Sequence, residues 1–180
     1  MNKILKLSLV LFLICAITAG ILGVVNELTK DQIYLQKNAK TFAAYATVLD
    51  SESYEEVEFD QAAYPTVDSI NKASNGTGYV VVSTFSGAQG SITMACGVNN
   101  EYKCTGISII DHSETSGLGA NAAADSEIGR NFRAQFVGED ENIALSKAGG
   151  SIDALAGATI TSRAVTQATA TSIAAVKSLG

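Results

Sequence analysis

This 180-residue chain has few residues that commonly bind metal ions through nitrogen or sulfur. It has a single histidine, His112, and three cysteines that form no Cys-x-x-Cys pair. Zinc and iron–sulfur sites need clusters of such ligands, so both kinds of site are excluded. Cys96 and Cys104 flank a turn at residues 99–100 and would face each other across a hairpin that pairs residue 98 with residue 102. A disulfide, which could form outside the membrane, and two buried free thiols both fit this placement.

Basic charge is also scarce. Residues 26–180 hold 18 acidic and 10 basic side chains, a net charge of −8 with His112 neutral. This composition argues against a nucleic-acid role, because no basic patch is available to neutralise phosphates. Residues 50–60 contain six carboxylates and no basic residue, which predicts a solvated face around an edge strand at 54–59. A calcium site is the alternative, but the oxygen spacing matches no calcium-loop signature.

Charge is absent altogether from residues 7–25. As a helix this run is long enough to cross a hydrocarbon core of about 30 Å. A cleaved signal peptide would end in an Ala-x-Ala-like site, whereas Thr18-Ala19-Gly20 is a poor one and is followed by more apolar residues. A lipoprotein signal would have a small residue before its cysteine, but Ile14 precedes Cys15. We therefore predict an uncleaved transmembrane anchor at residues 1–25 and one domain at residues 26–180.

The charges that flank this run predict its orientation. Lys3 and Lys6 precede it, and Glu27 and Asp31 follow it. By the positive-inside rule the N-terminus lies in the cytoplasm, so the domain is expected on the extracytoplasmic side of the cell membrane.

Proline occurs once, at Pro65, within residues 61–77, which we expect to form a loop. The domain is predicted to begin with a helix at residues 26–49. Three segments rich in Val, Ile, Thr, Tyr and Phe follow, separated by short Gly- or Asn-containing turns, and predict an antiparallel β-meander at 78–86, 91–98 and 102–110. A helix at 126–136, a short strand at 142–147 and a C-terminal helix complete the set. The expected fold class is α+β: an antiparallel meander packed with helices and preceded by one transmembrane helix.

The stretch from Asp153 to Ser162 combines small residues with hydroxyl side chains just before the C-terminal helix. Thr161 or Ser162 could cap that helix, which would place Thr159 just ahead of it. Free N–H groups and the helix dipole make such a position receptive to phosphate, although the dipole contributes only about 0.3–1 kcal/mol. An ordinary strand-to-helix turn has the same spacing.

Residues 112–119, directly after the last predicted strand, have three generic interpretations. Gly117-x-Gly119-x-x-Ala122 is a degenerate dinucleotide fingerprint, which would need a parallel βαβ unit that the predicted sheet lacks. His112 and Glu114 could form an acid–base pair of a hydrolase, but no nucleophile motif accompanies them. A polar turn is the simplest interpretation.

Both stretches resemble signatures of the FMN-binding subunits of Rnf and sodium-pumping quinone reductase complexes. The first matches the flavinylation motif as Asp153-x-x-x-Gly157-Ala158-Thr159-x-Thr161, with Ala156 where the family usually has Ser or Thr. The second matches His-x-Glu-Thr-Pro-Gly-Leu-Gly, with Ser116 in place of proline. A third element resembles the family's aromatic-Gln-Phe sequence, in the form Phe132-x-x-Gln135-Phe136-x-Gly138.

The resemblance implies that FMN is joined through its phosphate to Thr159. It also implies that the flavin is lined by Glu114, Thr115, Leu118 and Gly119. Three further residues of the motif are expected to bind the cofactor: Gly157, Ala158 and Thr161. The short chain with one anchor looks more like the G-type member of the Rnf complex than its longer quinone-reductase counterpart. The implied function is an electron carrier in a membrane complex that couples ferredoxin oxidation and NAD reduction to sodium or proton export. The polypeptide need not turn over a substrate alone.

The implied partners are the other membrane subunits and the flavin transferase that modifies Thr159. Two alternatives remain open: a quinone-reductase-like or stand-alone extracellular flavoprotein, and a surface-anchored binding domain with no redox role. Colour that survives denaturing electrophoresis would exclude the second. Co-purification with integral-membrane subunits would separate the complex member from a stand-alone flavoprotein.

Overall fold

A computed structural model describes residues 3–180, which divide into two units, one ending at Lys40 and the other comprising Thr41–Gly180. The N-terminal unit consists of the first part of helix α1 (Lys3–Val48). Within it, the 22 residues Lys6–Glu27 are all exposed, and the segment is apolar and long enough to cross a membrane. The predicted apolar helix is therefore confirmed, and the helix expected at residues 26–49 continues it without a break.

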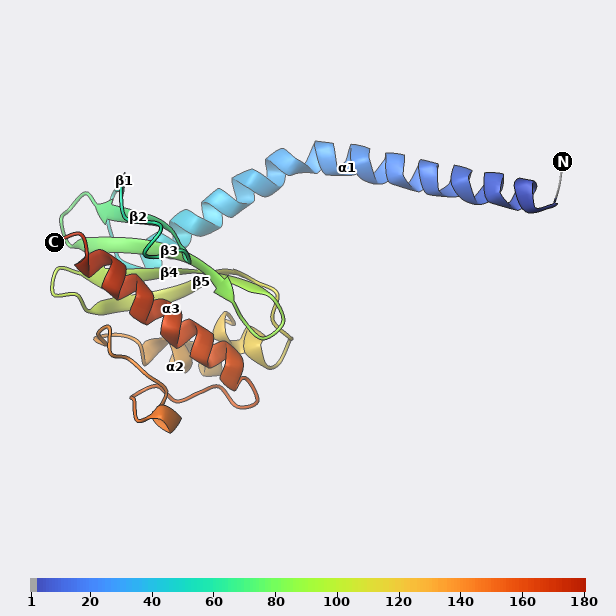
Figure 1. Cartoon of the computed structure of the whole chain (residues 1–180). Helices are drawn as coiled ribbons and strands as arrows, with labels where there is room; N and C mark the ends of the chain where they lie inside the picture. The colour runs from blue at the N-terminus through green and yellow to red at the C-terminus, as the bar shows by residue number, and fades with distance from the viewer. Residues whose placement is uncertain (1–2) are drawn as a thin grey trace. The chain divides into compact units, whose positions relative to one another are not determined.

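The second unit is built on one five-stranded antiparallel sheet in the order β1-β2-β3-β4-β5 (Figure 1). The strands are β1 (Tyr54–Val57), β2 (Val67–Ala73), β3 (Gly78–Ser86), β4 (Ser91–Asn99) and β5 (Cys104–His112). Each strand pairs with the next in sequence, so the predicted α+β meander is confirmed. Short turns favour this topology because antiparallel neighbours need only a tight connection.

Strand β2 lies in the region predicted to be a loop, and that prediction was wrong. Val67 and Ile70 are fully buried, but a register shift between Val67 and Ser69 breaks the regular alternation that marks a strand. The strand predicted at residues 142–147 is absent as well. That segment makes only an isolated bridge between Leu145 and Ile152, followed by a 3-10 turn at Ser146–Ala148.

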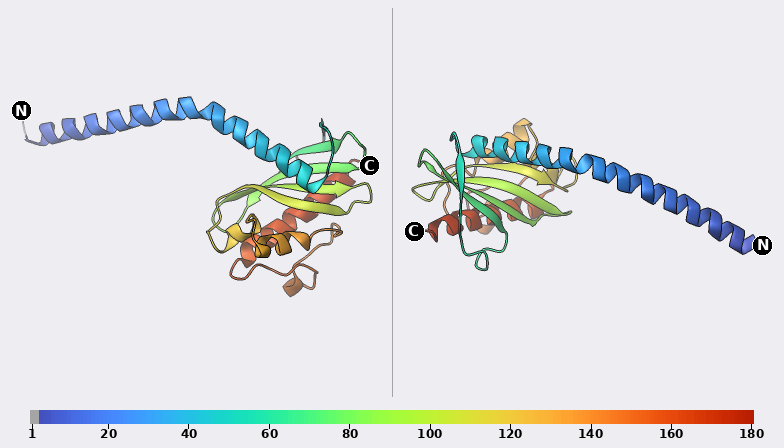
Figure 2. Two further views of the ribbon diagram at one scale, coloured as in Figure 1. Left: turned by 180° about the vertical axis from the view of Figure 1, so that it is seen from behind. Right: turned by 90° about the horizontal axis from the view of Figure 1, so that it is seen from above.

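Helices cover both faces of the sheet (Figure 2). On one face, α2 (Glu127–Ala134) and α3 (Thr159–Lys177) enclose the main core. Its largest buried side chains include Phe136, Met94, Ile70, Ile152 and Ile173. On the other face, the end of α1 packs its Tyr45 and Val48 against β3 and β4. The alternation of side chains along each strand allows a central strand to serve two cores at once.

Glycine at position 97 lets the end of α1 approach the sheet closely. A Cβ atom there would lie 2.5 Å from the carbonyl oxygen of Val48 and 2.2 Å from the hydroxyl of Thr105. That hydroxyl donates a hydrogen bond of 2.5 Å to the same carbonyl and so satisfies a group at the end of the helix.

Cys96 and Cys104 lie next to each other on neighbouring strands, but the strands do not pair in the predicted register. The turn pairs Val98 with Cys104 rather than residue 98 with residue 102, because the ladder shifts register between Gly97 and Val98. The thiols of Cys96 and Cys104 are buried and free, with their sulfur atoms 3.9 Å apart.

Candidate functional site

All eight residues predicted to line a cofactor site surround one cavity of about 310 Å³ at the N-terminal end of α3. Three segments supply its walls: the turn between β3 and β4, the loop after β5, and the start of α3 with the residues just before it. The lining residues are Ala88, Gln89, Glu114, Thr115, Leu118, Gly119, Gly157, Ala158, Thr159, Ile160 and Thr161.

Sequence reasoning missed Ala88, Gln89 and Ile160. The turn at Gly87–Gly90 was interpreted only as a connection between strands, and no pattern in the sequence places it beside Glu114. The signal for Ile160 was its place in the motif, as a large apolar residue between Thr159 and Thr161. In the structure 63% of its surface is exposed.

Glu114 ties the three segments of the site together. One carboxylate oxygen accepts hydrogen bonds from the backbone N–H groups of Ala88 at 2.8 Å and Gln89 at 3.1 Å. The other accepts from the hydroxyl of Thr161 at 2.5 Å. Burial by itself raises the pKa of Glu114, but the hydrogen bonds from Thr161, Gln89 and Ala88 outweigh it and lower the pKa below its ordinary value. The carboxylate is therefore charged at neutral pH, with both oxygens engaged.

Two glycines leave room for this carboxylate. A Cβ atom on Gly87 would lie 2.2 Å from one oxygen of Glu114, and a Cβ atom on Gly119 would lie 2.2 Å from the other. The Cβ on Gly119 would also lie 2.6 Å from the hydroxyl of Thr161. Any larger residue at position 119 would push the carboxylate away from its donors.

The two threonines of the motif are in different environments. Thr161 has no exposed surface, and its hydroxyl donates to Glu114. Thr159 is half-buried on the cavity wall, and its hydroxyl makes no hydrogen bond within residues 3–180. Of the two hydroxyls, only that of Thr159 is available to react.

The expected capping of α3 was wrong in its details. The helix begins at Thr159 itself, and Ala158 occupies the cap position without a side-chain hydrogen bond. Ser162 instead bridges the turn, because its hydroxyl accepts from the N–H of Leu155 and donates to the carbonyl of Ala158, both at 2.9 Å. Thr159 thus belongs to the first turn of the helix, where backbone N–H groups lack intrahelical acceptors.

The cavity that Thr159 lines also has exposed apolar surface. Leu118 and Ile160 line the cavity while keeping 44% and 63% of their surfaces exposed. Gly157 has a φ of 71°, and a Cβ there would come within 3.0 Å of Leu118. Exposed apolar side chains, backbone polar groups and one free hydroxyl suit a flat aromatic ligand that carries a phosphate, and the volume falls within the usual range of small-molecule sites. The residues present fit FMN.

The third sequence element, at residues 132–138, packs in the core and holds the segment that leads to Thr159. Phe132 and Phe136 pack edge to face in the core, with ring centres 5.2 Å apart. Between them, the side-chain amide of Gln135 accepts from the N–H of Asp153 at 2.7 Å and donates to its carbonyl at 3.3 Å. Gln135 therefore fixes the start of the stretch that ends at Thr159.

The generic alternatives for residues 112–122 do not fit this geometry. The Nδ1 atom of His112 accepts a hydrogen bond from the backbone N–H of Glu114 at 3.3 Å, while the Glu114 carboxylate is held by other donors. No acid–base pair is formed. The fingerprint-like glycines follow an antiparallel strand and lead into a 3-10 turn, Gly119–Ala122, rather than a parallel βαβ unit.

Removing the Glu114 side chain should destabilise the domain. We expect Glu114→Ala to lower the free energy of unfolding by about 1–3 kcal/mol, because the Thr161 hydroxyl is left buried without its acceptor. Urea unfolding monitored by circular dichroism measures this loss. The exposed Glu101→Ala is the control and should change stability by less than about 0.5 kcal/mol. Equal effects of the two substitutions would contradict the role given to Glu114.

The Glu114 carboxylate should also make the stability of the domain depend on pH. Because folding lowers the pKa of Glu114 below 4.5, its charge stabilises the folded state at neutral pH. That contribution is lost as the pH falls through the lowered pKa. The stability difference between the wild type and Glu114→Gln should therefore be full at neutral pH and shrink in acid.

Comparison with known proteins identifies the family. A model of the FMN-binding domain matches residues 87–174, and a model of the RnfG N-terminal region matches residues 1–48. The G subunit of an ion-translocating oxidoreductase complex from Methanosarcina acetivorans is 32% identical, over 93% of this chain and 91% of that protein. The G subunit of a proton-translocating ferredoxin:NAD(+) oxidoreductase complex from Clostridium ljungdahlii is 30% identical, over 92% and 88%.

Among solved structures, the C subunit of a Na(+)-translocating NADH-quinone reductase from Parabacteroides distasonis aligns over 66% of this chain and 65% of that one. The identity is 23% and the TM-score 0.46. The sequence relatives match nearly end to end, through the apolar helix as well as the domain that carries the cavity. The chain belongs to the RnfG family, the G subunits of ion-translocating oxidoreductase (Rnf) complexes.

Proposed function

We propose that this protein carries FMN, esterified through its phosphate to the hydroxyl of Thr159, and acts as an electron carrier within an Rnf-type membrane complex. The observation that carries the proposal is the contrast between the two threonines of the motif. Thr159 presents an unengaged hydroxyl on a cavity wall, whereas Thr161 is buried and bonded to Glu114. A hydroxyl already committed to a carboxylate is less free to be esterified.

Bound FMN supplies one- and two-electron redox chemistry, and the polypeptide supplies position and electrostatics. Leu118 and Ile160 offer apolar surface against which the ring can lie. Glu114 holds the surrounding segments together and keeps a fixed negative charge near the cavity. A fixed negative charge disfavours the addition of negative charge nearby, so Glu114 lowers the tendency of the site to accept electrons.

The apolar helix Lys6–Glu27 fits an anchor in the membrane of such a complex. With Lys3 and Lys6 ahead of it, we place the N-terminus in the cytoplasm and residues 26–180 on the extracytoplasmic side. A covalent link suits that side, because a flavin that dissociated there would be lost by dilution, whereas a tether keeps it at an effective concentration of roughly millimolar. Protease added to right-side-out vesicles should therefore digest the domain, and digestion in inverted vesicles alone would reverse the orientation.

The partners in this proposal are the other membrane subunits of the complex and a flavin transferase that forms the ester. The relatives from Methanosarcina acetivorans and Clostridium ljungdahlii are named as subunits of such complexes. In this assembly the chain passes electrons within a system that couples ferredoxin oxidation and NAD reduction to ion export. It need not turn over a substrate by itself.

Peptide mapping tests the proposal directly. The full chain is co-expressed with a flavin transferase, purified in detergent and separated by denaturing electrophoresis, where a fluorescent band is expected. Tryptic cleavage after Lys147 and Arg163 releases one peptide that contains both threonines. Fragment ions should place a mass increase of FMN minus one water on Thr159. The adduct on Thr161, or no adduct at all, would contradict the proposal.

A further inference from the structure

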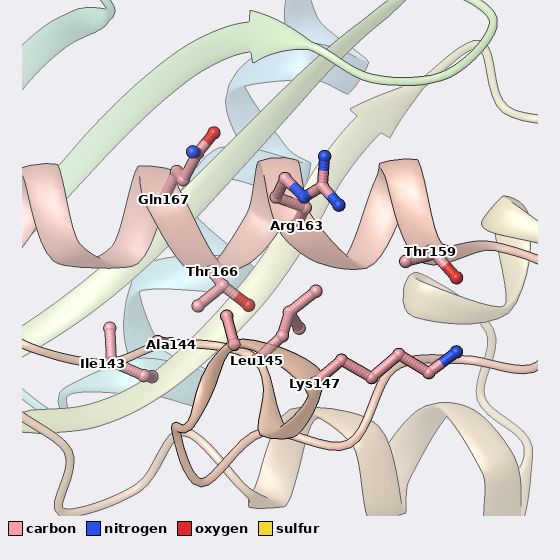
Figure 3. Close-up of a pocket in the computed structure, with 9 residues that line it drawn as sticks. Ile143, Ala144, Leu145, Lys147, Thr159, Arg163, Thr166 and Gln167 are labelled. Carbon is pink, nitrogen blue, oxygen red and sulfur yellow. The ribbon is translucent and has the colours of Figure 1, made fainter.

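A second cavity, of about 380 Å³, also has Thr159 in its lining (Figure 3). It is bounded by the first three turns of α3 and by the segment that includes the 3-10 turn Ser146–Ala148. Its lining residues are Ile143, Ala144, Leu145, Lys147, Ala148, Thr159, Arg163, Thr166 and Gln167. Thr159 is the one residue that lines both this cavity and the Glu114 cavity.

The second cavity holds two cations without anionic partners. Residues 41–180 contain seven Lys and Arg residues and 16 Asp and Glu residues. Three of the cations form ion pairs: Lys103 with Asp140, Arg130 with Asp125, and Lys177 with Glu141. A fourth, Arg133, donates to the carbonyls of Ala122 and Ala124.

Three cations remain, and two of them, Lys147 and Arg163, line this cavity, while Lys72 lies on β2. Across the part of the chain that the structure describes, neither Lys147 nor Arg163 is engaged by a carboxylate, and no acidic residue lines the cavity. In a domain with an excess of acidic residues, a cavity lined by two unpaired cations is a local site of positive potential.

Both cations lie on segments that border Thr159. Arg163 follows Thr159 by four residues on α3, so the two share one face of the helix. Lys147 extends along the cavity toward the end of α3 that carries Thr159 (Figure 3). Its segment is fixed, because the N–H of Ile152 donates to Ala144 at 3.1 Å and the N–H of Ser146 donates to Ile152 at 2.8 Å.

We propose that this second cavity binds the phosphate of the flavin nucleotide joined to Thr159, and that Lys147 and Arg163 balance its charge. The inference rests on the proposed function and adds a cationic phosphate site to it. A phosphodiester keeps one negative charge, which an ammonium and a guanidinium can contact through charge-assisted hydrogen bonds. Because Thr159 lines both cavities, its phosphate can face the two cations while the ring lies in the Glu114 cavity, against Leu118 and Ile160.

The test uses the full chain labelled with ¹⁵N, in detergent and produced without flavin transferase, so that no ester is present. FMN, inorganic phosphate and riboflavin are titrated separately, and backbone amide shifts are followed. FMN and phosphate should shift the amides of Lys147 and Arg163, which line only the second cavity, whereas riboflavin, which lacks the phosphate, should not. Lys147→Gln and Arg163→Gln should each weaken FMN binding by about two- to fivefold. Lys72→Gln is the matched control and should leave FMN binding unchanged.

Equal effects of riboflavin and FMN at these amides, no shifts at all, or equal weakening by Lys72→Gln would overturn the site. This titration does not depend on the ester, so it can succeed where peptide mapping of Thr159 fails, and the reverse also holds. The flavin-loaded protein supplies the last comparison. Its tethered phosphate should already occupy the cavity, so added phosphate should no longer shift the amides of Lys147 and Arg163. A persisting shift would assign the cavity to a separate phosphate and overturn the link to Thr159.

Discussion

Replacing Thr159 with alanine should give a folded protein that carries no covalently bound flavin, a complete loss relative to the wild type. Alanine favours the helix at least as well as threonine, and the Thr159 hydroxyl has no acceptor to lose in the part of the chain that the structure covers. Circular dichroism should therefore show an unchanged fold. Flavin absorbance and in-gel fluorescence, measured after co-expression with the transferase, report the loss.

Two further substitutions make this result specific. Thr159→Ser retains a hydroxyl at the same position and should keep covalent flavin. Thr161→Val keeps the size of the side chain but removes the hydrogen bond to Glu114, at a cost of about 1–3 kcal/mol. This variant should be less stable yet still flavinylated. If flavin is lost from Thr161→Val and kept in Thr159→Ala, the assignment of the attachment residue is wrong.

Phe136→Ala should lower the free energy of unfolding by about 3–5 kcal/mol, the largest stability effect expected in the domain. Phe136 is fully buried and packs edge to face on Phe132, so the truncation leaves a cavity and removes the ring pair. Folded domains are stable by only about 5–15 kcal/mol, so the variant retains little margin. The midpoint of urea unfolding measures the change.

The neighbouring residue supplies a matched control. Val137 is 58% exposed, so Val137→Ala should change stability by less than about 0.5 kcal/mol. Gln135→Ala tests the link to the site separately, because it removes only the two hydrogen bonds to Asp153, each contributing about 0.5–1.5 kcal/mol. A small effect of Phe136→Ala would mean that α2 and the turn after it contribute little to the core.

Strands β3, β4 and β5 were predictable from sequence, because they are rich in Val, Ile and Thr and are joined by short turns. Their bounds were predicted within about two residues, the usual margin for such boundaries. Strand β2 was not predictable, because polar residues separate its buried ones and hide the apolar pattern of a strand; they are Asp68, Ser69, Asn71 and Lys72. The register shift between Val67 and Ser69 also interrupts the period of two. The strand predicted at residues 142–147, which includes Lys147, was wrong because a short apolar pattern suggested a strand. The chain there forms a single bridge and a 3-10 turn.

The residues of the site were predictable from sequence, but the hydrogen bonds that hold them in place were not. The motifs named eight residues, and all eight line one cavity. The hydrogen bonds that hold Glu114 were not predictable, because they depend on a turn 25 and 26 residues earlier in the chain. Long-range contacts of this kind leave no periodic signal. The cap of α3 was not predictable from spacing either, because the Ser162 hydroxyl bonds to the backbone of Leu155 and Ala158 instead of capping the helix.

The edge strand β1 gives the acidic run at residues 50–60 a physical role. β1 pairs only with β2, so the backbone groups along its outer side are open to a strand from another molecule. At the opposite edge, the first residue of β5 is already bonded to Gly138 and Glu139. Glu55 and Glu56 are exposed on β1, and like charges on two such edges repel each other. Edge-to-edge pairing of two copies through β1 is therefore disfavoured, which protects the open edge of the sheet against aggregation.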